Sequence, residues 1–188
     1  MRRDSKLIDA IEALEPEPYA GPVWRVVRDG RDPTQGSASG GRWDDETFDV
    51  LYTSLEDNGA IAEMYFHLRR GQPIMPSKPK YRLHELTARL DHALNLLDLK
   101  ALSALGLDIG KYGRLAYEER QGEYPRSQEI AEVAHFLEFD GLLVPCARWN
   151  CGNAVLFCDR VAPEGRIEKQ DHGQIDFSDW AAKNKVTI

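Results

Sequence analysis

Apolar residues in the first part of the chain recur at two spacings, and each spacing predicts a different element. Between residues 5 and 14 they follow the helical period, so we expect an opening helix that Pro16 and Pro18 end. A short apolar run at 23–27 predicts a strand. The stretch 29–41 is rich in Gly, Ser, Asp and Pro, which is typical of a loop.

A strand and a helix are predicted next, in direct succession. Residues 50–53 have the composition of a strand. Thr53 or Ser54 can then cap a helix, because an acidic residue follows three positions later, as in a capping box. We expect this helix to run to about Arg70, where Gly71 stops it.

The second half of the chain continues with mixed strand and helical spacing. The predicted elements are a strand over 81–97, a helix over 99–105, a polar irregular stretch over 108–124, a helix over 127–137, strands over 142–144 and 153–158, and then, within 159–188, one more strand and a short helix over 178–183. Regular β–α–β alternation is absent, so the pattern favours an α+β fold.

Length and charge narrow the range of functions. The chain has 188 residues, enough for one domain with a real core, and a formal net charge of -7. This acidic excess argues against broad binding of nucleic acid, which needs a basic face. The amino-terminal residues lack the apolar stretch of a secretory signal, and no apolar run is long enough to cross a membrane. We therefore expect a protein that binds neither nucleic acid nor membrane.

Three cysteines, Cys146, Cys151 and Cys158, crowd into one segment. A disulfide framework uses an even and dispersed set, so we expect a reduced, cytoplasmic protein. The spacing contains no C-x-x-C pair, and the five histidines form no H-x-x-x-H pair. We therefore expect no metal site.

A first candidate site combines glycine with arginine. Arg25 follows Trp24 in the predicted strand, and the loop after it ends in Gly41-Arg42-Trp43. Glycine lets the backbone approach an anion closely, while a guanidinium binds the anion through two parallel hydrogen bonds. The pattern indicates a ligand that carries phosphate. A solvated surface loop is the alternative interpretation.

Tyr52 and Glu63 form a second candidate. A tyrosine ring offers a flat face for a heteroaromatic ring, and a nearby carboxylate can stabilise positive charge as a glycosidic bond breaks. The alternative is structural. Tyr52 would then be a core residue, and Glu63 would pair with His67 four residues later on the helix surface.

The third candidate lies around the late strands. Cys146 follows the buried strand over 142–144, and Asn153 begins the next strand. Cys146 could be a nucleophile with His135 as a distant base, which would make the protein a cysteine hydrolase. A small core cysteine is the structural alternative.

Taken in order, these segments resemble the RES domain, a family named for an arginine, a glutamate and a serine. The matching stretches are Trp24-Arg25, Gly40-Gly41-Arg42-Trp43, Leu51-Tyr52-Thr53-Ser54, Ala60-Ile61-Ala62-Glu63, Ser127-Gln128-Glu129-Ile130, Gly141-Leu142-Leu143-Val144-Pro145-Cys146-Ala147-Arg148 and Asn153-Ala154-Val155-Leu156-Phe157. No single stretch is specific, but the ordered set is. It spans about residues 23–158. We therefore expect residues 1–188 to form a single RES-like domain, with a helix at about 5–15 before the motifs and an extension over 159–188.

The resemblance implies a fold, an activity and a partner. The fold would be similar to that of ADP-ribosyltransferases, with a split antiparallel sheet flanked by helices. The activity would be that of a toxin that consumes NAD⁺, as an NAD⁺ phosphorylase, a glycohydrolase or an ADP-ribosyltransferase, with no metal. The partner would be an antitoxin with an Xre-like helix-turn-helix domain.

Roles for individual residues follow from the resemblance. Glu63, Arg25 and Tyr52 would be catalytic: Glu63 would stabilise charge on the ribose, Arg25 would bind pyrophosphate and Tyr52 would flank nicotinamide. The residues expected to bind NAD⁺ or line its site are Arg42, Gly41, Cys146 and Asn153.

Cys146 departs from the family pattern, which has serine at this position. A thiol is a poorer hydrogen-bond partner than a hydroxyl, so the change puts full activity in doubt and also creates a site that can be oxidised. It favours an alternative function, a catalytically weak or inactive module that binds a nucleotide or a partner.

Overall fold

The computed structural model describes residues 4–69, 79–113 and 124–186. In chain order its elements are α1 (Ser5–Glu12), β1 (Glu17–Arg28), β2 (Val50–Ser54), α2 (Asp57–Leu68), β3 (Tyr81–Asn95), α3 (Leu99–Ala104), α4 (Tyr124–Phe136), β4 (Gly141–Pro145), β5 (Gly152–Phe157), the 3-10 helix η2 (Pro163–Gly165), β6 (Arg166–Gln174) and α5 (Phe177–Lys183). The predicted α+β class is confirmed. No helix among these is long and apolar enough to span a membrane.

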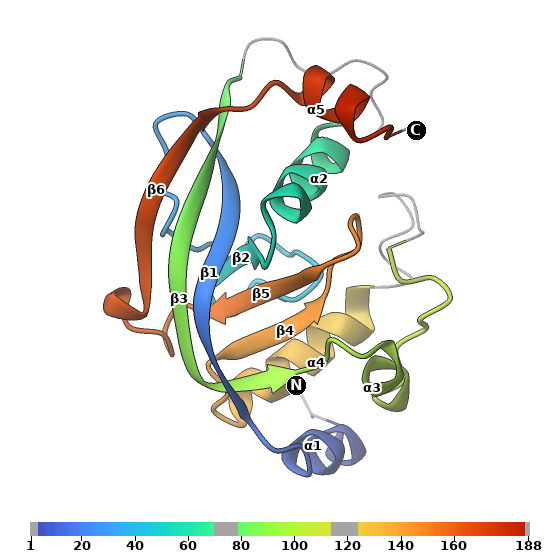
Figure 1. Cartoon of the computed structure of the whole chain (residues 1–188). Helices are drawn as coiled ribbons and strands as arrows, with labels where there is room; N and C mark the ends of the chain where they lie inside the picture. The colour runs from blue at the N-terminus through green and yellow to red at the C-terminus, as the bar shows by residue number, and fades with distance from the viewer. Residues whose placement is uncertain (1–3, 70–78, 114–123, 187–188) are drawn as a thin grey trace.

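One strongly bent sheet contains all six strands, in the order β1-β2-β5-β4-β3-β6, and β1 also pairs with β3. The sheet therefore consists of two halves. The long strands β1, β3 and β6 form one half, and the short strands β2, β5 and β4 form the other (Figure 1). The halves join at two places: Trp24 of β1 pairs with Ser54 of β2, and the end of β3 pairs with β4.

The expectation of a split sheet flanked by helices is confirmed, with one correction. All strand pairs are antiparallel except β3 with β4, which run parallel over three residue pairs from Ala93↔Gly141 to Asn95↔Leu143. The chain between these two strands crosses through α3 and α4, and a crossover of this length permits a parallel pair.

Three apolar clusters hold the layers together. The largest lies between α1, α4 and the outer face of the short half-sheet, with Ile11, Ile130 and Val155 fully buried. A second fills the space between the two half-sheets, where Leu51 and Leu86 are fully buried. The third packs α2 and α5 against the outer face of the long half-sheet. The helices therefore cover the outside of the bent sheet.

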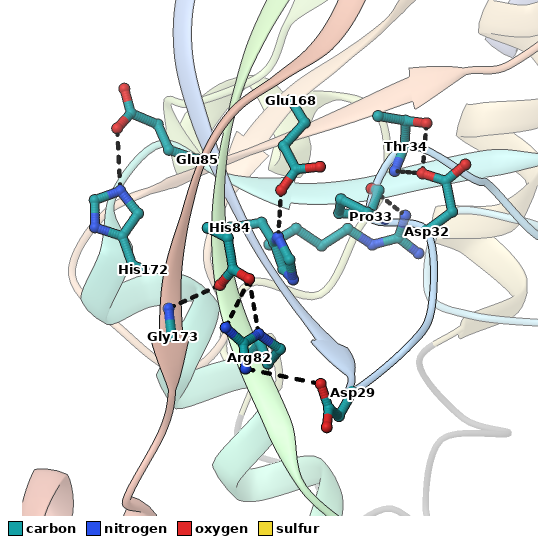
Figure 2. Close-up of polar contacts among 12 residues, drawn as sticks. Asp29, Asp32, Pro33, Thr34, Arg82, His84, Glu85, Glu168, His172 and Gly173 are labelled. Atoms are coloured by element: carbon teal, nitrogen blue, oxygen red, sulfur yellow. Dashed lines mark hydrogen bonds and ion pairs between the residues drawn. The ribbon is translucent and has the colours of Figure 1, made fainter.

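Polar contacts tie β6 to the long half-sheet. Most side chains of β6 are exposed, so apolar burial contributes little to holding this strand. Figure 2 shows polar side chains that link it to its neighbour: His84 of β3 contacts Glu168 at 2.7 Å, and Glu85 contacts His172 at 3.2 Å. In the same view, Arg82 of β3 lies 3.8 Å from Asp29, which follows β1. The sequence pattern indicated only that one more strand would occur in this region.

The predicted cap of α2 is wrong. Glu56 occupies the cap position without a side-chain hydrogen bond, because β2 continues through both proposed cap residues. The Thr53 hydroxyl instead donates to the Ala154 carbonyl across the strand pair at 2.7 Å. The other helices match their predictions closely, although α4 begins three residues early at Tyr124. Most of the predicted irregular stretch over 108–124 lies outside the described residues.

Replacing Gly141 by alanine tests the joint between the half-sheets. A Cβ on Gly141 would collide with the Val155 carbonyl of β5, and backbone cannot move away cheaply. We expect Gly141→Ala to lower the free energy of unfolding by about 1 to 3 kcal/mol. Chemical denaturation measures this loss. Gly110→Ala is the matched control, because its Cβ would meet only a side-chain oxygen of Asp108; an equal effect of both changes would contradict the packing argument.

Candidate active site

The Gly-Gly-Arg-Trp loop is built around a buried carboxylate. Asp44 is fully buried, and its two oxygens accept the backbone N–H groups of Gly40 and Gly41 at 2.6 and 2.8 Å. Gly40 has a φ of 69°, a conformation that glycine adopts without strain. Gly41 leaves no room for a side chain, because a Cβ there would meet the Tyr52 hydroxyl and Asp44. The two glycines are thus needed for the loop to close on Asp44.

Gln128 of α4 fixes the same loop from the other side. Its amide nitrogen, Nε2, donates to the Gly41 and Asp44 carbonyls at 2.8 and 2.9 Å. Ser127 beside it is fully buried. The loop that carries Arg42 is therefore fastened to the first turns of α4.

Tyr52 acts as a support for this loop. Its hydroxyl donates to Asp44 at 2.9 Å and accepts the Trp43 backbone N–H at 2.8 Å. Burial and the adjacent Asp44 carboxylate raise the pKa of Tyr52 well above its ordinary value, so the phenol stays neutral. Its hydroxyl proton is thus used within the protein. A role beside nicotinamide stays a prediction.

Glu63 points from α2 toward the turn between β4 and β5. Its Oε1 accepts three hydrogen bonds, from Cys146 Sγ and the Ala147 backbone N–H at 3.2 Å each and from Asn153 Nδ2 at 3.3 Å. Oε2 receives no hydrogen bond from any described residue. The side chain is only partly exposed. The carboxylate is therefore held in one orientation, with one oxygen left for a ligand.

Asn153 can be oriented in only one way. Its Nδ2 is the sole part of the amide able to donate to the Glu63 carboxylate, so Oδ1 must point elsewhere. Oδ1 is buried and has no hydrogen-bond partner within the described part of the chain. Asn153 thus acts here by fixing Glu63. The three residues that lie together, Glu63, Cys146 and Asn153, were all predicted from the sequence.

Arg42 lies beside two aromatic rings. Its guanidinium carbon is 4.7 Å from the centre of the Tyr112 ring and 5.0 Å from that of Tyr124. The Tyr112 hydroxyl donates to the Pro145 carbonyl at 2.6 Å, directly before Cys146. Through Tyr112, Arg42 is thus connected to the segment after β4 that holds Glu63.

Arg25 is not brought together with Glu63. Trp24 pairs with Ser54 on the outer face, and side chains alternate along a strand, so Arg25 projects from the inner face. Its Nη1 donates to the carbonyls of Pro33 and Gln35 at 2.8 and 2.7 Å. Burial lowers the pKa of Arg25 to about 10, which still leaves it charged at neutral pH. Its predicted role at the pyrophosphate is unsupported by any contact with the other candidates.

The arrangement excludes a Cys146–His135 pair. His135 stacks on Phe48 at 4.3 Å and contacts Asp159 at 2.9 Å, beside the Phe157 end of β5. Cys146 lies beyond the opposite end of that strand, facing Cys151 and so about 20 Å away at an ordinary strand rise. No group of three metal-ligating side chains occurs among the residues that the structure describes.

The sequence did not indicate Asp44 or Cys151 as part of the site. Asp44 could have been noticed, because an acidic residue shortly after two glycines can accept their amide protons. Cys151 follows the turn after β4, and its Sγ contacts the Ser54 hydroxyl at 3.4 Å. Its place opposite Cys146 depends on strand register, which the spacing of the cysteines alone does not give.

Replacing Tyr52 by phenylalanine tests the support of the loop. The change removes a hydrogen bond to a buried carboxylate and leaves the Trp43 N–H without its acceptor. We expect a loss of about 2 to 4 kcal/mol in the free energy of unfolding, measured by denaturation. Tyr19→Phe, which removes one hydrogen bond to the Pro22 carbonyl, is the control and should cost about 1 kcal/mol. Equal losses would show that the contact with Asp44 contributes little.

Comparisons with known proteins agree with this architecture. No curated protein matches the sequence significantly. Among solved structures, a chain of the M. tuberculosis MbcT-MbcA toxin-antitoxin complex is similar, with a TM-score of 0.79 and 20% sequence identity over 97% of this chain and 99% of that chain. A family model described as the RES domain matches residues 22–178. The chain therefore belongs to the RES domain family.

Proposed function

We propose that this protein is a toxin-type enzyme that cleaves the bond between nicotinamide and ribose in NAD⁺. One observation carries the proposal: the Glu63 carboxylate is held by three donors on one oxygen, and no described residue donates to the other. A fixed carboxylate is suited to stabilising positive charge that develops in a transition state, because it needs no reorganisation during the reaction.

The proposed reaction begins with departure of nicotinamide. The ring leaves as a neutral molecule that takes the electron pair of the glycosidic bond, so no general acid is required. The ribose then carries oxocarbenium character, and Oε2 of Glu63 stabilises it. Attack by water gives ADP-ribose, attack by phosphate gives its 1-phosphate, and attack by a protein side chain gives an ADP-ribosylated protein.

Arg42 is the proposed anchor for the pyrophosphate. It is presented by a loop that Asp44 and Gln128 hold rigid, and the aromatic rings beside it restrict its guanidinium. A preoriented guanidinium loses little freedom when it binds phosphate oxygens. Arg25 remains a weaker candidate for this task, because it projects from the other face of the sheet.

We also propose a protein partner. The structurally similar chain comes from a complex of a toxin with an antitoxin. By the same family resemblance, the partner of this chain would be an antitoxin with an Xre-like helix-turn-helix domain, which would neutralise it in the cytoplasm.

Glu63→Gln tests the activity. The variant keeps the size of the side chain but removes its charge, so we expect the release of nicotinamide from NAD⁺ to fall about a hundredfold or more. Chromatography of reactions with and without phosphate measures the rate and identifies the product. Glu56→Gln is the matched control: Glu56 is exposed, precedes the same helix and makes no side-chain cap bond. Release of nicotinamide at the unaltered rate by Glu63→Gln would refute the role of the carboxylate.

Cys146 favours a second candidate, a binding module with little or no catalysis. Its thiol donates to Glu63 where the family has a hydroxyl, and a thiol is the weaker donor. Binding of NAD⁺ in calorimetry without any release of nicotinamide would support this function. If the enzyme function holds, Cys146→Ser should instead raise turnover several-fold, and unaltered or lower turnover would contradict the idea that the thiol limits the rate.

A further inference from the structure

Cys146 and Cys151 face each other across the β4–β5 hairpin. Pro145 pairs with Gly152, so the next opposed pair of the ladder is Cys146 with Cys151. The Cys146 N–H donates to the Cys151 carbonyl at 2.9 Å, which continues the ladder by one step. Directly opposed residues have their side chains on one face and their Cα atoms about 5.5 Å apart, a separation that a disulfide spans.

We propose that Cys146 and Cys151 form a reversible dithiol–disulfide pair, and that a low-molecular-weight disulfide oxidises it. Both cysteines are free thiols in the structure. The pair is absent from the family pattern, because that pattern has serine where this chain has Cys146. It is therefore a feature of this chain rather than of the fold.

The two thiols also influence each other. Contact with Cys151 raises the pKa of Cys146, and burial adds to the increase. The same contact lowers the pKa of Cys151. Cys146 has a single S–H proton and two acceptors within reach, the Glu63 carboxylate and the Cys151 sulfur. Cys151 is thus the better nucleophile of the pair, and it is also the more exposed, since Cys146 is only 9% exposed.

Oxidation proceeds in two balanced steps. The Cys151 thiolate attacks the external disulfide, forms a mixed disulfide and releases one thiolate. Cys146 then attacks Cys151 Sγ, the S–S bond of the mixed disulfide breaks, and the second external thiol leaves with the proton that Cys146 gives up. The protein loses two protons and two electrons in total, and the external disulfide is reduced to two thiols.

A disulfide between Cys146 and Cys151 would alter the adjacent contacts of Glu63. Cys146 can no longer donate to Glu63 once its sulfur is bonded to Cys151, so Oε1 loses one of its three hydrogen bonds. Cys151 also touches Ser54, and a Cβ on Gly59 of α2 would collide with both. Movement of the Cys151 sulfur therefore acts on the first turn of the helix that carries Glu63. This effect on turnover rests on the proposed function, whereas formation of the disulfide does not.

Peptide mapping tests the disulfide directly. The purified chain is incubated with glutathione disulfide or with dithiothreitol, and the remaining thiols are alkylated before digestion with trypsin. Arg148 lies between the two cysteines, so the disulfide joins the tryptic peptide that ends at Arg148 to the one that begins at Trp149. We expect this linked pair only after oxidation, with Cys158 alkylated, and we expect dithiothreitol to reverse it.

Single substitutions assign the bond. Cys158 shares a peptide with Cys151 but follows β5 at its other end, about 23 Å along the chain, so it cannot reach Cys146. Cys158→Ser should therefore keep the linked pair, and Cys151→Ser should abolish it. Alkylation of both Cys146 and Cys151 after oxidation overturns the proposal, and so does a mixed disulfide that persists without forming the internal bond.

Turnover measured on the same samples separates the two proposals. We expect oxidation to lower the release of nicotinamide at least several-fold, with recovery in dithiothreitol and with no effect of the oxidant on Cys151→Ser, which lacks the thiol that attacks the oxidant. If the linked peptides form but neither redox state releases nicotinamide, the oxidation site stands and the proposed enzyme function fails. If nicotinamide is released but no link forms, the enzyme function stands and the oxidation site fails.

Discussion

Glu63 of α2 reaches the turn between β4 and β5. The position of the helix depends on the hydrogen bonds that Glu63 accepts from residues of that turn and of β5. The backbone N–H of Ala147 and the amide of Asn153 belong to the turn and to the strand after it, so they are fixed by the sheet rather than by the helix. At the start of α2, Gly59 allows close contact with Ser54 and Cys151. A bulkier residue would lift the helix, and the carboxylate would lose contacts that join two separate parts of the fold.

Asp44, in the loop before β2, is a second carboxylate that joins separate segments. It is a carboxylate that accepts backbone amide protons and a side-chain proton, and it keeps the loop and the neighbouring strand together. Burial of this polar group is tolerated because both of its oxygens accept hydrogen bonds. The molecule thus uses two carboxylates for different ends. Asp44 is fully buried and supports the loop, whereas Glu63 is partly exposed and its Oε2 accepts no hydrogen bond from a described residue.

Local patterns in the sequence predicted most elements, since helices and strands follow from apolar spacing and from glycine and proline at their ends. The members of the site on β4 and β5 were predicted through the ordered set of motifs, and Glu63 lies with Cys146 and Asn153 as that set implies. Arg25 shows what the sequence alone could not predict. A sequence places it one residue after Trp24, but the face to which it points depends on the pairing of Trp24 with Ser54, a contact between distant segments. The cap of α2 was missed for a similar reason, because the ladder with β5 extends β2.

Cys146 gives the site a property that a serine could not. A serine hydroxyl would donate to Glu63 more strongly, but Cys151 would then have no sulfur to bond with, and its contacts with Ser54 and α2 would be packing alone. With a thiol at both positions, the donor to the carboxylate is also one half of an oxidisable pair. The Cys146 sulfur therefore has two effects. It weakens the hydrogen bond to Glu63, and it makes the site sensitive to the surrounding thiol–disulfide balance.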